Sequence, residues 1–151
     1  MLYLASDHRG FGLKEKVKEF LNTVKIEYKD FGNLVYDKDD DLPDFASKVA
    51  KKISQNSKKD KGIVICGSGV GGSIISNKFK KVRAALCLTV NVAKESREHH
   101  DSNVLCLAAD LTDSSVAWMI IKKWLTTPPP SKARYQNRLK IIEKIEKENF
   151  K

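Results

Sequence analysis

The stretch that decides the fold is GIVICGSGVGG, residues 62–72. It is apolar up to Cys66 and then continues with glycines on both sides of Ser68. An apolar run that enters a glycine-rich turn is typical of a buried strand in a parallel sheet. When a helix follows, backbone N–H groups and the helix N-terminus point toward one small anion, here beside a thiol. The sequence therefore predicts an anion-binding site directly after this strand.

On both sides of this stretch, apolar runs alternate with segments of helical periodicity. The expected strands are 2–5, 26–31, 63–66, 82–88 and 104–108. The expected helices are 13–21, one that starts at 44, 71–78, 92–99, 114–125 and 131–148. This order predicts an α/β fold: a Rossmann-like, doubly wound sheet of five parallel strands with an extra C-terminal helix.

In such a sheet, ligands bind beyond the carboxyl ends of the strands. Asp7 and His8 follow the first expected strand, and the glycine-rich turn follows the third. A further polar group, 99–103, lies just before the fifth strand and contains His99, His100 and Asn103. We expect all of these residues to gather around one site.

The length of 151 residues suits a single domain over 1–151. The last helix follows the proline run TPPP at 127–130 and has a narrow apolar stripe on an otherwise charged surface, formed by Leu139, Ile141, Ile142 and Ile145. Such a helix can lie on its own domain or reach a second subunit. Periodicity alone leaves both arrangements open.

Three cysteines in apolar runs and no signal-peptide pattern favour reduced thiols and a cytoplasmic protein. No apolar stretch approaches the roughly 20 residues of a membrane span. The formal charge is +9, from 28 Lys and Arg against 19 Asp and Glu. The lysines are scattered along helical faces without interleaved aromatic residues, which favours a solvated surface over binding to nucleic acid or a membrane.

Two other classes of site remain as alternatives. Gly67, Gly69 and Gly72 satisfy G-x-G-x-x-G, the dinucleotide-binding pattern. The pattern follows the third strand rather than the first, however, and no acidic residue ends the next strand to hold a ribose. A basic RNA-binding module is the second alternative. No CxxC or HxxxH spacing suggests a metal site, so we expect an enzyme without a cofactor.

Five segments together point to a known family. They are SDHRG at 6–10, GIVICGSGVGGSIISNKF at 62–79, VRAALC at 82–87, SREHHDSNVL at 96–105 and ARYQNRL at 133–139. On these segments the chain resembles the ribose-5-phosphate isomerase B group, which includes the galactose-6-phosphate isomerase subunits. The resemblance implies conversion of D-ribose 5-phosphate to D-ribulose 5-phosphate in the non-oxidative pentose phosphate pathway. It also implies a homodimer, or a tetramer, whose sites are shared between subunits.

The resemblance also implies roles for residues of the glycine-rich segment. Cys66 is the base that moves a proton between adjacent carbons through an enediolate, and Ser68 contacts substrate hydroxyls. Backbone N–H groups hold the charge of the enediolate; they belong to Gly67, Gly69, Val70 and Gly71. For an arbitrary cysteine, burial without a catalytic role is the commoner explanation, and we expect it for Cys87 and Cys106.

Ring opening and phosphate binding fall to residues elsewhere in the chain. His99, or its neighbour His100, opens the sugar ring, and Asp7 orients the ring oxygen or a hydroxyl. The resemblance places His8 on the phosphate side. It also makes Asn103 a residue that closes the pocket, although a plain cap before the fifth strand explains it equally well.

Two arginines and three departures from the family pattern complete the expected site. Arg134 and Arg138 stand four residues apart, so both project from one helical face and can grip a phosphate. The departures are His100 for asparagine, Tyr135 for histidine and Asp110 for arginine; Gly72, where one branch has a glutamate base, argues against that branch. A carboxylate at 110 repels a phosphate, so either its loop turns away, or Arg134 and Arg138 suffice, or the preferred substrate differs, with a hexose 6-phosphate as the alternative.

Overall fold

The computed structural model describes residues 1–150 and contains one five-stranded sheet flanked by helices. The strands are β1 (Leu2–Ser6), β2 (Tyr28–Asp30), β3 (Lys61–Cys66), β4 (Ala84–Leu86) and β5 (Val104–Ala108). The helices are α1 (His8–Thr23), α2 (Pro43–Gln55), α3 (Val70–Ser76), α4 (Val90–His100), α5 (Ser114–Thr126) and α6 (Ala133–Asn149). All pairings are parallel and the strand order is β2-β1-β3-β5-β4, which confirms the predicted doubly wound sheet.

The three central strands behave differently from the two edge strands. β1 and β5 are buried throughout, and β3 is buried after its first residue. β2 and β4 are three residues long and only half-buried, so the longer expected strands 26–31 and 82–88 were wrong at both ends. An edge strand forms hydrogen bonds with a neighbour on one side only, so fewer of its residues are held in the sheet.

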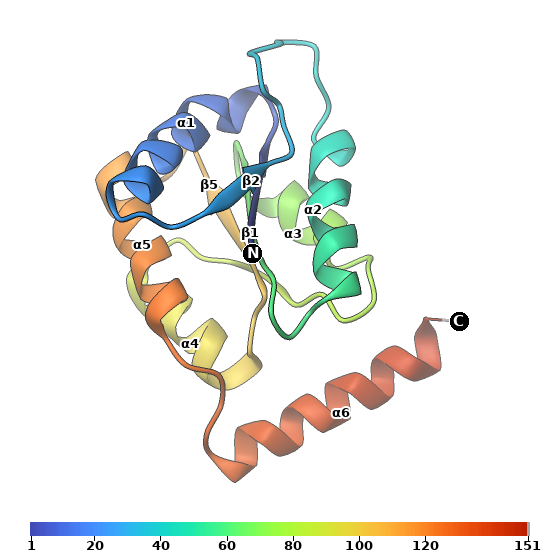
Figure 1. The fold of residues 1–151 in the computed structure, drawn as a ribbon. Coiled ribbons are helices and arrows are strands. Elements are labelled where there is room, and N and C mark those ends of the chain that lie inside the picture. Colours follow the sequence, from blue (N-terminus) through green and yellow to red (C-terminus); the bar gives the residue numbers. More distant parts are fainter. Residues whose placement is uncertain (151) are drawn as a thin grey trace.

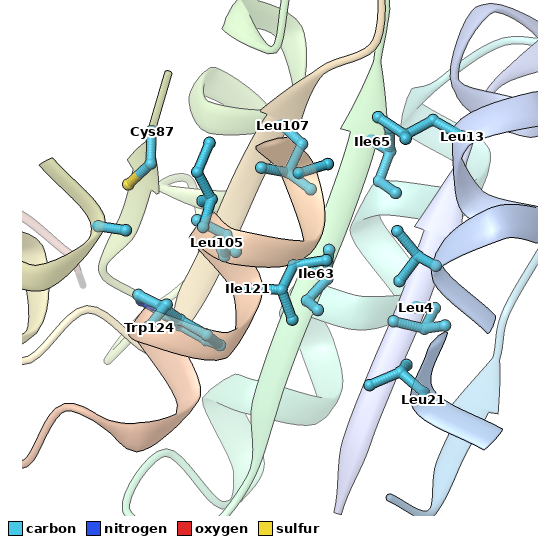
Figure 2. Packing of buried hydrophobic residues seen from close by; sticks show 14 of the residues in the cluster. Leu4, Leu13, Leu21, Ile63, Ile65, Cys87, Leu105, Leu107, Ile121 and Trp124 are labelled. Atoms are coloured by element: carbon cyan, nitrogen blue, oxygen red, sulfur yellow. The ribbon is translucent and has the colours of Figure 1, made fainter. Parts of the chain in front are cut away.

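Helices cover both faces of the sheet (Figure 1). On one face, α1, α4 and α5 pack over Leu4, Ile63 and Leu105, and Trp124 of α5 is fully buried there (Figure 2). On the other face, α2 and α3 pack over a second cluster that contains Cys66 and Cys106. Burial on both faces explains why the strands are continuously apolar.

α1 begins at His8, five residues earlier than the expected helix 13–21. The carboxylate of Asp7 caps it, because Oδ1 accepts a hydrogen bond from the N–H of Gly10 at 2.9 Å. Gly10 lets the helix lie against β3: a Cβ there would be 2.6 Å from the carbonyl carbon of Ile65. Gly10 and Gly12 interrupt the apolar periodicity at the start of α1, so the sequence pattern did not indicate that the helix begins before residue 13.

α6 lies apart from the sheet and contacts α4 (Figure 1). None of its residues is buried, and Ile141 and Ile145 are exposed. Its C-terminal half is tied to the body by Glu146, whose carboxylate accepts a hydrogen bond from the N–H of Lys81. Among residues 1–150, the structure contains no helix that is both long and apolar enough to cross a membrane.

Candidate active site

The carboxyl ends of β1, β3 and β5 bring the first group of predicted residues together. Ser6 lies opposite Ile65, and Cys66 lies opposite Ala108, so Asp7 and Cys66 leave neighbouring strands at the same level. Adjacent strands are about 4.8 Å apart. Cys66 is only 4% exposed, and its carbonyl oxygen accepts a hydrogen bond from the N–H of Ala109 at 2.9 Å. The thiol therefore sits on rigid backbone at the edge of the core.

The glycine-rich turn after Cys66 has little freedom to accept side chains. Gly69 has φ +75°, a left-handed conformation, and a Cβ there would overlap the side chain of Leu86. Ser68 is exposed, and its Oγ lies 3.4 Å from the N–H of Val70, which donates to it. The turn thus places a hydroxyl at the surface two residues after the buried thiol.

Gly72, at the position of the glutamate in one family branch, is buried. A Cβ at this glycine would lie 2.9 Å from Cγ1 of Val64. A longer side chain would have to push the side chain of Val64 aside, so the local packing favours glycine here. Gly71 is less restricted, since its nearest neighbour would be Leu42 at 3.0 Å.

His8 is held by a residue that the sequence analysis did not single out. Asp40 accepts hydrogen bonds from the backbone N–H of His8 and from its ring Nδ1, both at 2.8 Å. This hydrogen bond to Asp40 raises the pKa of His8 above its ordinary 6.5. Burial alone would raise the pKa of Asp40, but the hydrogen bonds from His8 and Asn33 outweigh it and lower that pKa.

Arg9 is a second residue of this edge that sequence reasoning missed. Its guanidinium donates to the carboxylate of Asp110, which follows β5, and it lies over Gly67. A Cβ on Gly67 would be 2.7 Å from Nη2 of Arg9. The negative charge of Asp110 is therefore paired rather than free.

His99, His100 and the two arginines form a second group, which we call the helix-end half-site. His99 stacks on Tyr135 of α6 with ring centroids 4.3 Å apart, and the guanidinium of Arg138 lies 5.4 Å from the same ring. Arg134 is exposed one turn earlier in α6. Burial lowers the pKa of His100, and repulsion from the positive charge of Arg138 lowers it further.

The helix-end half-site does not meet Cys66 within one chain. α4 runs back along the sheet, so its C-terminus lies at the amino end of β5, whereas Cys66 lies at the carboxyl end. Four residues of strand separate the two ends, roughly 13 Å. The structure therefore does not bring His99 and His100 together with Asp7 and Cys66 within one chain, because residues that precede a parallel strand emerge at the opposite end of it from residues that follow a parallel strand. We call the Asp7, His8 and 66–71 group the carboxyl-edge half-site.

Asn103 also belongs to the amino edge of the sheet. Its Oδ1 accepts from the N–H of Arg83 at 2.8 Å, and its Nδ2 donates to the carbonyl of Lys81 at 2.7 Å. The side chain is 2% exposed. In this chain it joins β5 to the loop before β4, as the alternative of a plain cap predicts.

The remaining thiols are buried in the two cores. Burial raises the pKa of Cys87 to about 11, although a hydrogen bond to Ser96 opposes the shift. Burial also raises the pKa of Cys106. All three cysteines are free. Between residues 1 and 150, His, Cys, Asp and Glu side chains nowhere form a group of three that could hold a metal ion.

Comparison with known proteins gives the family. The model described as Ribose/Galactose Isomerase matches residues 2–142. A probable ribose-5-phosphate isomerase B from Mycoplasma genitalium is 40% identical over 147 residues, which are 97% of this chain and 96% of that protein. Ribose-5-phosphate isomerase B from Escherichia coli is 37% identical over 140 residues, covering 93% and 92% of the two chains.

Solved structures agree with this assignment. A crystal structure of ribose-5-phosphate isomerase B from Mycoplasma genitalium with bound ribulose 5-phosphate has a TM-score of 0.93, covering 98% of this chain and 97% of that one. The corresponding enzyme of Clostridium thermocellum has a TM-score of 0.90 at 37% identity. Because the family model and the relatives match the chain from β1 into α6, the chain belongs to the ribose/galactose isomerase family.

Proposed function

We propose that this protein interconverts D-ribose 5-phosphate and D-ribulose 5-phosphate, in the non-oxidative pentose phosphate pathway. The observation that carries the proposal is Cys66, a thiol at the carboxyl end of β3 that opens onto a glycine-rich turn. The relatives named ribose-5-phosphate isomerase B, one of them with ribulose 5-phosphate bound, support the choice of a pentose phosphate. The buried, free cysteines suit a cytoplasmic enzyme.

In the proposed reaction, the thiolate of Cys66 takes the proton from C2 of the open-chain aldose. The electron pair then forms the enediolate, and the same proton returns to C1 while a proton moves from the C2 hydroxyl to the C1 oxygen. In this proposal, the hydroxyl of Ser68 and the N–H groups of Gly67, Gly69, Val70 and Gly71 hold the enediolate oxygens. Gly72 stands where one family branch has a glutamate base and carries no carboxylate, which supports Cys66 in this role.

The remaining steps use residues from both half-sites. We assign ring opening to His99, with Asp7 orienting the ring oxygen. His8, Arg134 and Arg138 bind the phosphate side, and His100, beside His99, contacts the substrate. The two half-sites lie at opposite edges of one sheet, so a complete site needs the helix-end half-site of a partner subunit.

A homodimer, or a tetramer built from it, supplies that partner. Residues 1–151 form one isomerase domain in this proposal, and the helix over 131–148 packs on the partner subunit. Two observations support it: α6 leaves the body after the proline run, and Ile141 and Ile145 are exposed on it. A soluble chain gains by covering such side chains.

The first experiment is steady-state conversion of D-ribose 5-phosphate in the presence of a chelator. Native protein should turn over, Cys66→Ala should not, and Cys87→Ala should serve as the control for loss of a buried thiol from the other side of the sheet. Circular dichroism checks that each variant is folded. No turnover of the pentose, with turnover of D-galactose 6-phosphate or D-allose 6-phosphate, would instead assign a hexose phosphate. Activity in Cys66→Ala would refute the assignment of the base.

Subunit mixing tests the shared site directly. Cys66→Ala and His99→Asn are each inactive alone, but a mixed dimer has one site with both native residues and one site with neither. Random mixing should therefore restore about a quarter of the native activity. A site built within one chain would give no restoration at any ratio.

A further inference from the structure

The ion pair between Arg9 and Asp110 lies beside the carboxyl-edge half-site. Arg9 is in the first turn of α1, next to His8, and Asp110 is two residues beyond the end of β5. The backbone N–H of Asp110 donates to the carbonyl of Gly67 at 3.0 Å, so the backbone that carries the carboxylate is anchored to the glycine-rich turn. The pair thus bridges α1 and the segment after β5 across that turn.

Both charged groups are accessible. The side chain of Arg9 is 56% exposed and that of Asp110 is 43% exposed, whereas Cys66 is 4% exposed. An exposed ion pair contributes little to stability. Folding therefore does not require the guanidinium to stay on Asp110, and a stronger anionic ligand can replace the carboxylate.

The guanidinium also has a defined resting place. It lies against Gly67, where any side chain would occupy its position. Two other ionisable groups of this edge are fixed in position by the fold: Asp7 caps α1, and Asp40 orients His8. Arg9 differs from them because its planar guanidinium is paired only with an exposed carboxylate.

We propose that Arg9 is a substrate-binding residue: its guanidinium leaves Asp110 and binds the phosphate of the sugar phosphate over Gly67. Two parallel N–H···O hydrogen bonds to phosphate match the fork of an arginine, a geometry that lysine cannot reproduce. Asp110 then acts as a competing internal anion rather than as an obstacle to phosphate. This inference rests on the function proposed above.

The position of Arg9 favours the phosphate over the enediolate as its ligand. The enediolate forms at carbon atoms next to the buried thiol of Cys66, whereas the guanidinium is at the exposed rim of the turn. A dianionic phosphate remains partly solvated at such a rim. A sugar that reaches from Cys66 to the rim would present its phosphate to Arg9.

The test substitutes each member of the pair in turn, and the two substitutions should change KM in opposite directions. Arg9→Ala should raise KM for ribose 5-phosphate roughly 10-fold or more and leave kcat within a few-fold, since it loses charge-assisted hydrogen bonds. Asp110→Asn should lower KM, and the inhibition constant of inorganic phosphate, by about two- to five-fold, because the competing carboxylate is gone. Arg9→Lys should recover only part of the loss. Lys16→Ala, which removes an exposed positive charge from the same helix, is the control for net charge and should change neither constant.

Three results would overturn the proposal. One is an unchanged KM and phosphate inhibition in Arg9→Ala. Another is weaker phosphate binding in Asp110→Asn as well as in Arg9→Ala, because a pair that only supports the turn would lose function from either side. The third is an equal loss with unphosphorylated D-ribose, which would show that Arg9 acts on the sugar.

Phosphate binding measured by calorimetry separates this proposal from the proposed function. If native protein does not turn over ribose 5-phosphate, the isomerase proposal fails, but the dependence of phosphate affinity on Arg9 and Asp110 is still measured. If turnover is present and phosphate affinity ignores both residues, the inference about Arg9 fails alone.

Discussion

Gly10→Ala should destabilise the protein and displace the first turn of α1. At this position α1 approaches β3 so closely that a new Cβ would overlap the carbonyl oxygen of Ile65 and lie 3.0 Å from Cβ of Ser6. The obstacle is backbone of a central strand, which cannot rotate away as a side chain can. The helix must therefore move, and it carries Asp7 and His8 with it.

The magnitude follows from two opposing effects. Alanine gains about 1 kcal/mol over glycine inside a helix. Overpacking against a fixed neighbour costs about 1–3 kcal/mol, and occasionally more. We expect the cost to dominate at position 10, because ordinary contacts between such atoms are about 3.5–4.0 Å. The expected net loss is about 1–2 kcal/mol, and for a domain of this size each kcal/mol lowers Tm by about 2–4 °C.

Gly12→Ala is a matched control in the same helix. A Cβ at Gly12 would meet nothing within 4 Å, and the residue is exposed. This variant should gain about 0.5–1 kcal/mol from helix propensity alone. The two substitutions are chemically identical and two residues apart, so they should shift the urea midpoint in opposite directions.

The assay is urea unfolding followed by circular dichroism, at one protein concentration for all variants. kcat/KM for ribose 5-phosphate is measured in parallel, and it should fall in Gly10→Ala and stay unchanged in Gly12→Ala. Equal or greater stability of Gly10→Ala would show that α1 does not approach β3 as closely as the structure has it. The position of Asp7 and His8 relative to Cys66 would then differ from the one described above.

Two further predictions concern buried and paired charges. Lys14→Met should cost about 1.5–3 kcal/mol, because it removes the fully buried one of the two lysines that pair with Asp30 of β2, whereas Lys18, 3.2 Å from the same carboxylate, remains. Lys16→Met, at an exposed site, should change the urea midpoint little, and a similar small effect at both positions would refute this. Asp40→Asn should lower the pKa of His8 in an NMR titration. Because the pKa of His8 is raised in the folded protein, His8 stabilises the fold below its ordinary pKa of 6.5, and this stabilisation is lost as the pH rises through the pKa of the folded state. Because the pKa of Asp40 is lowered, Asp40 stabilises the fold above its ordinary pKa of 3.8, and this stabilisation is lost as the pH falls through the pKa of the folded state. Native and Asp40→Asn proteins should thus differ most in unfolding free energy between these two pKa values, and a constant difference across pH would contradict the pair.

Much of the fold was predictable because its elements are encoded locally. Continuous apolar runs predicted β1, β3 and β5, and Cys66 was correctly placed at the end of a strand before a glycine-rich turn. The errors fall where a local pattern is weak. Residues of β2 and β4 have one strand partner, and the start of α1 depends on a cap by Asp7 and on glycines that periodicity does not recognise.

The half-sites show a different limit. Periodicity assigned His99 and His100 to a helix but did not place that helix's end relative to Cys66, since the edge at which a residue emerges follows from the direction of the strand after it. The pairing of Arg9 with Asp110 joins residues 101 positions apart, and that of His8 with Asp40 joins residues 32 apart. No local pattern contains such contacts.

The sequence by itself determined the class of fold, the thiol at a strand end, the glycine-rich turn and an apolar stripe on the last helix. Hydrophobic periodicity and turn chemistry act over a few residues, so they are legible in the order of amino acids. The tertiary structure alone decided the strand order, the separation of the two half-sites and the partners of Arg9 and His8. These depend on how the helices pack across the sheet and bring distant segments to one edge, which is a property of the whole chain.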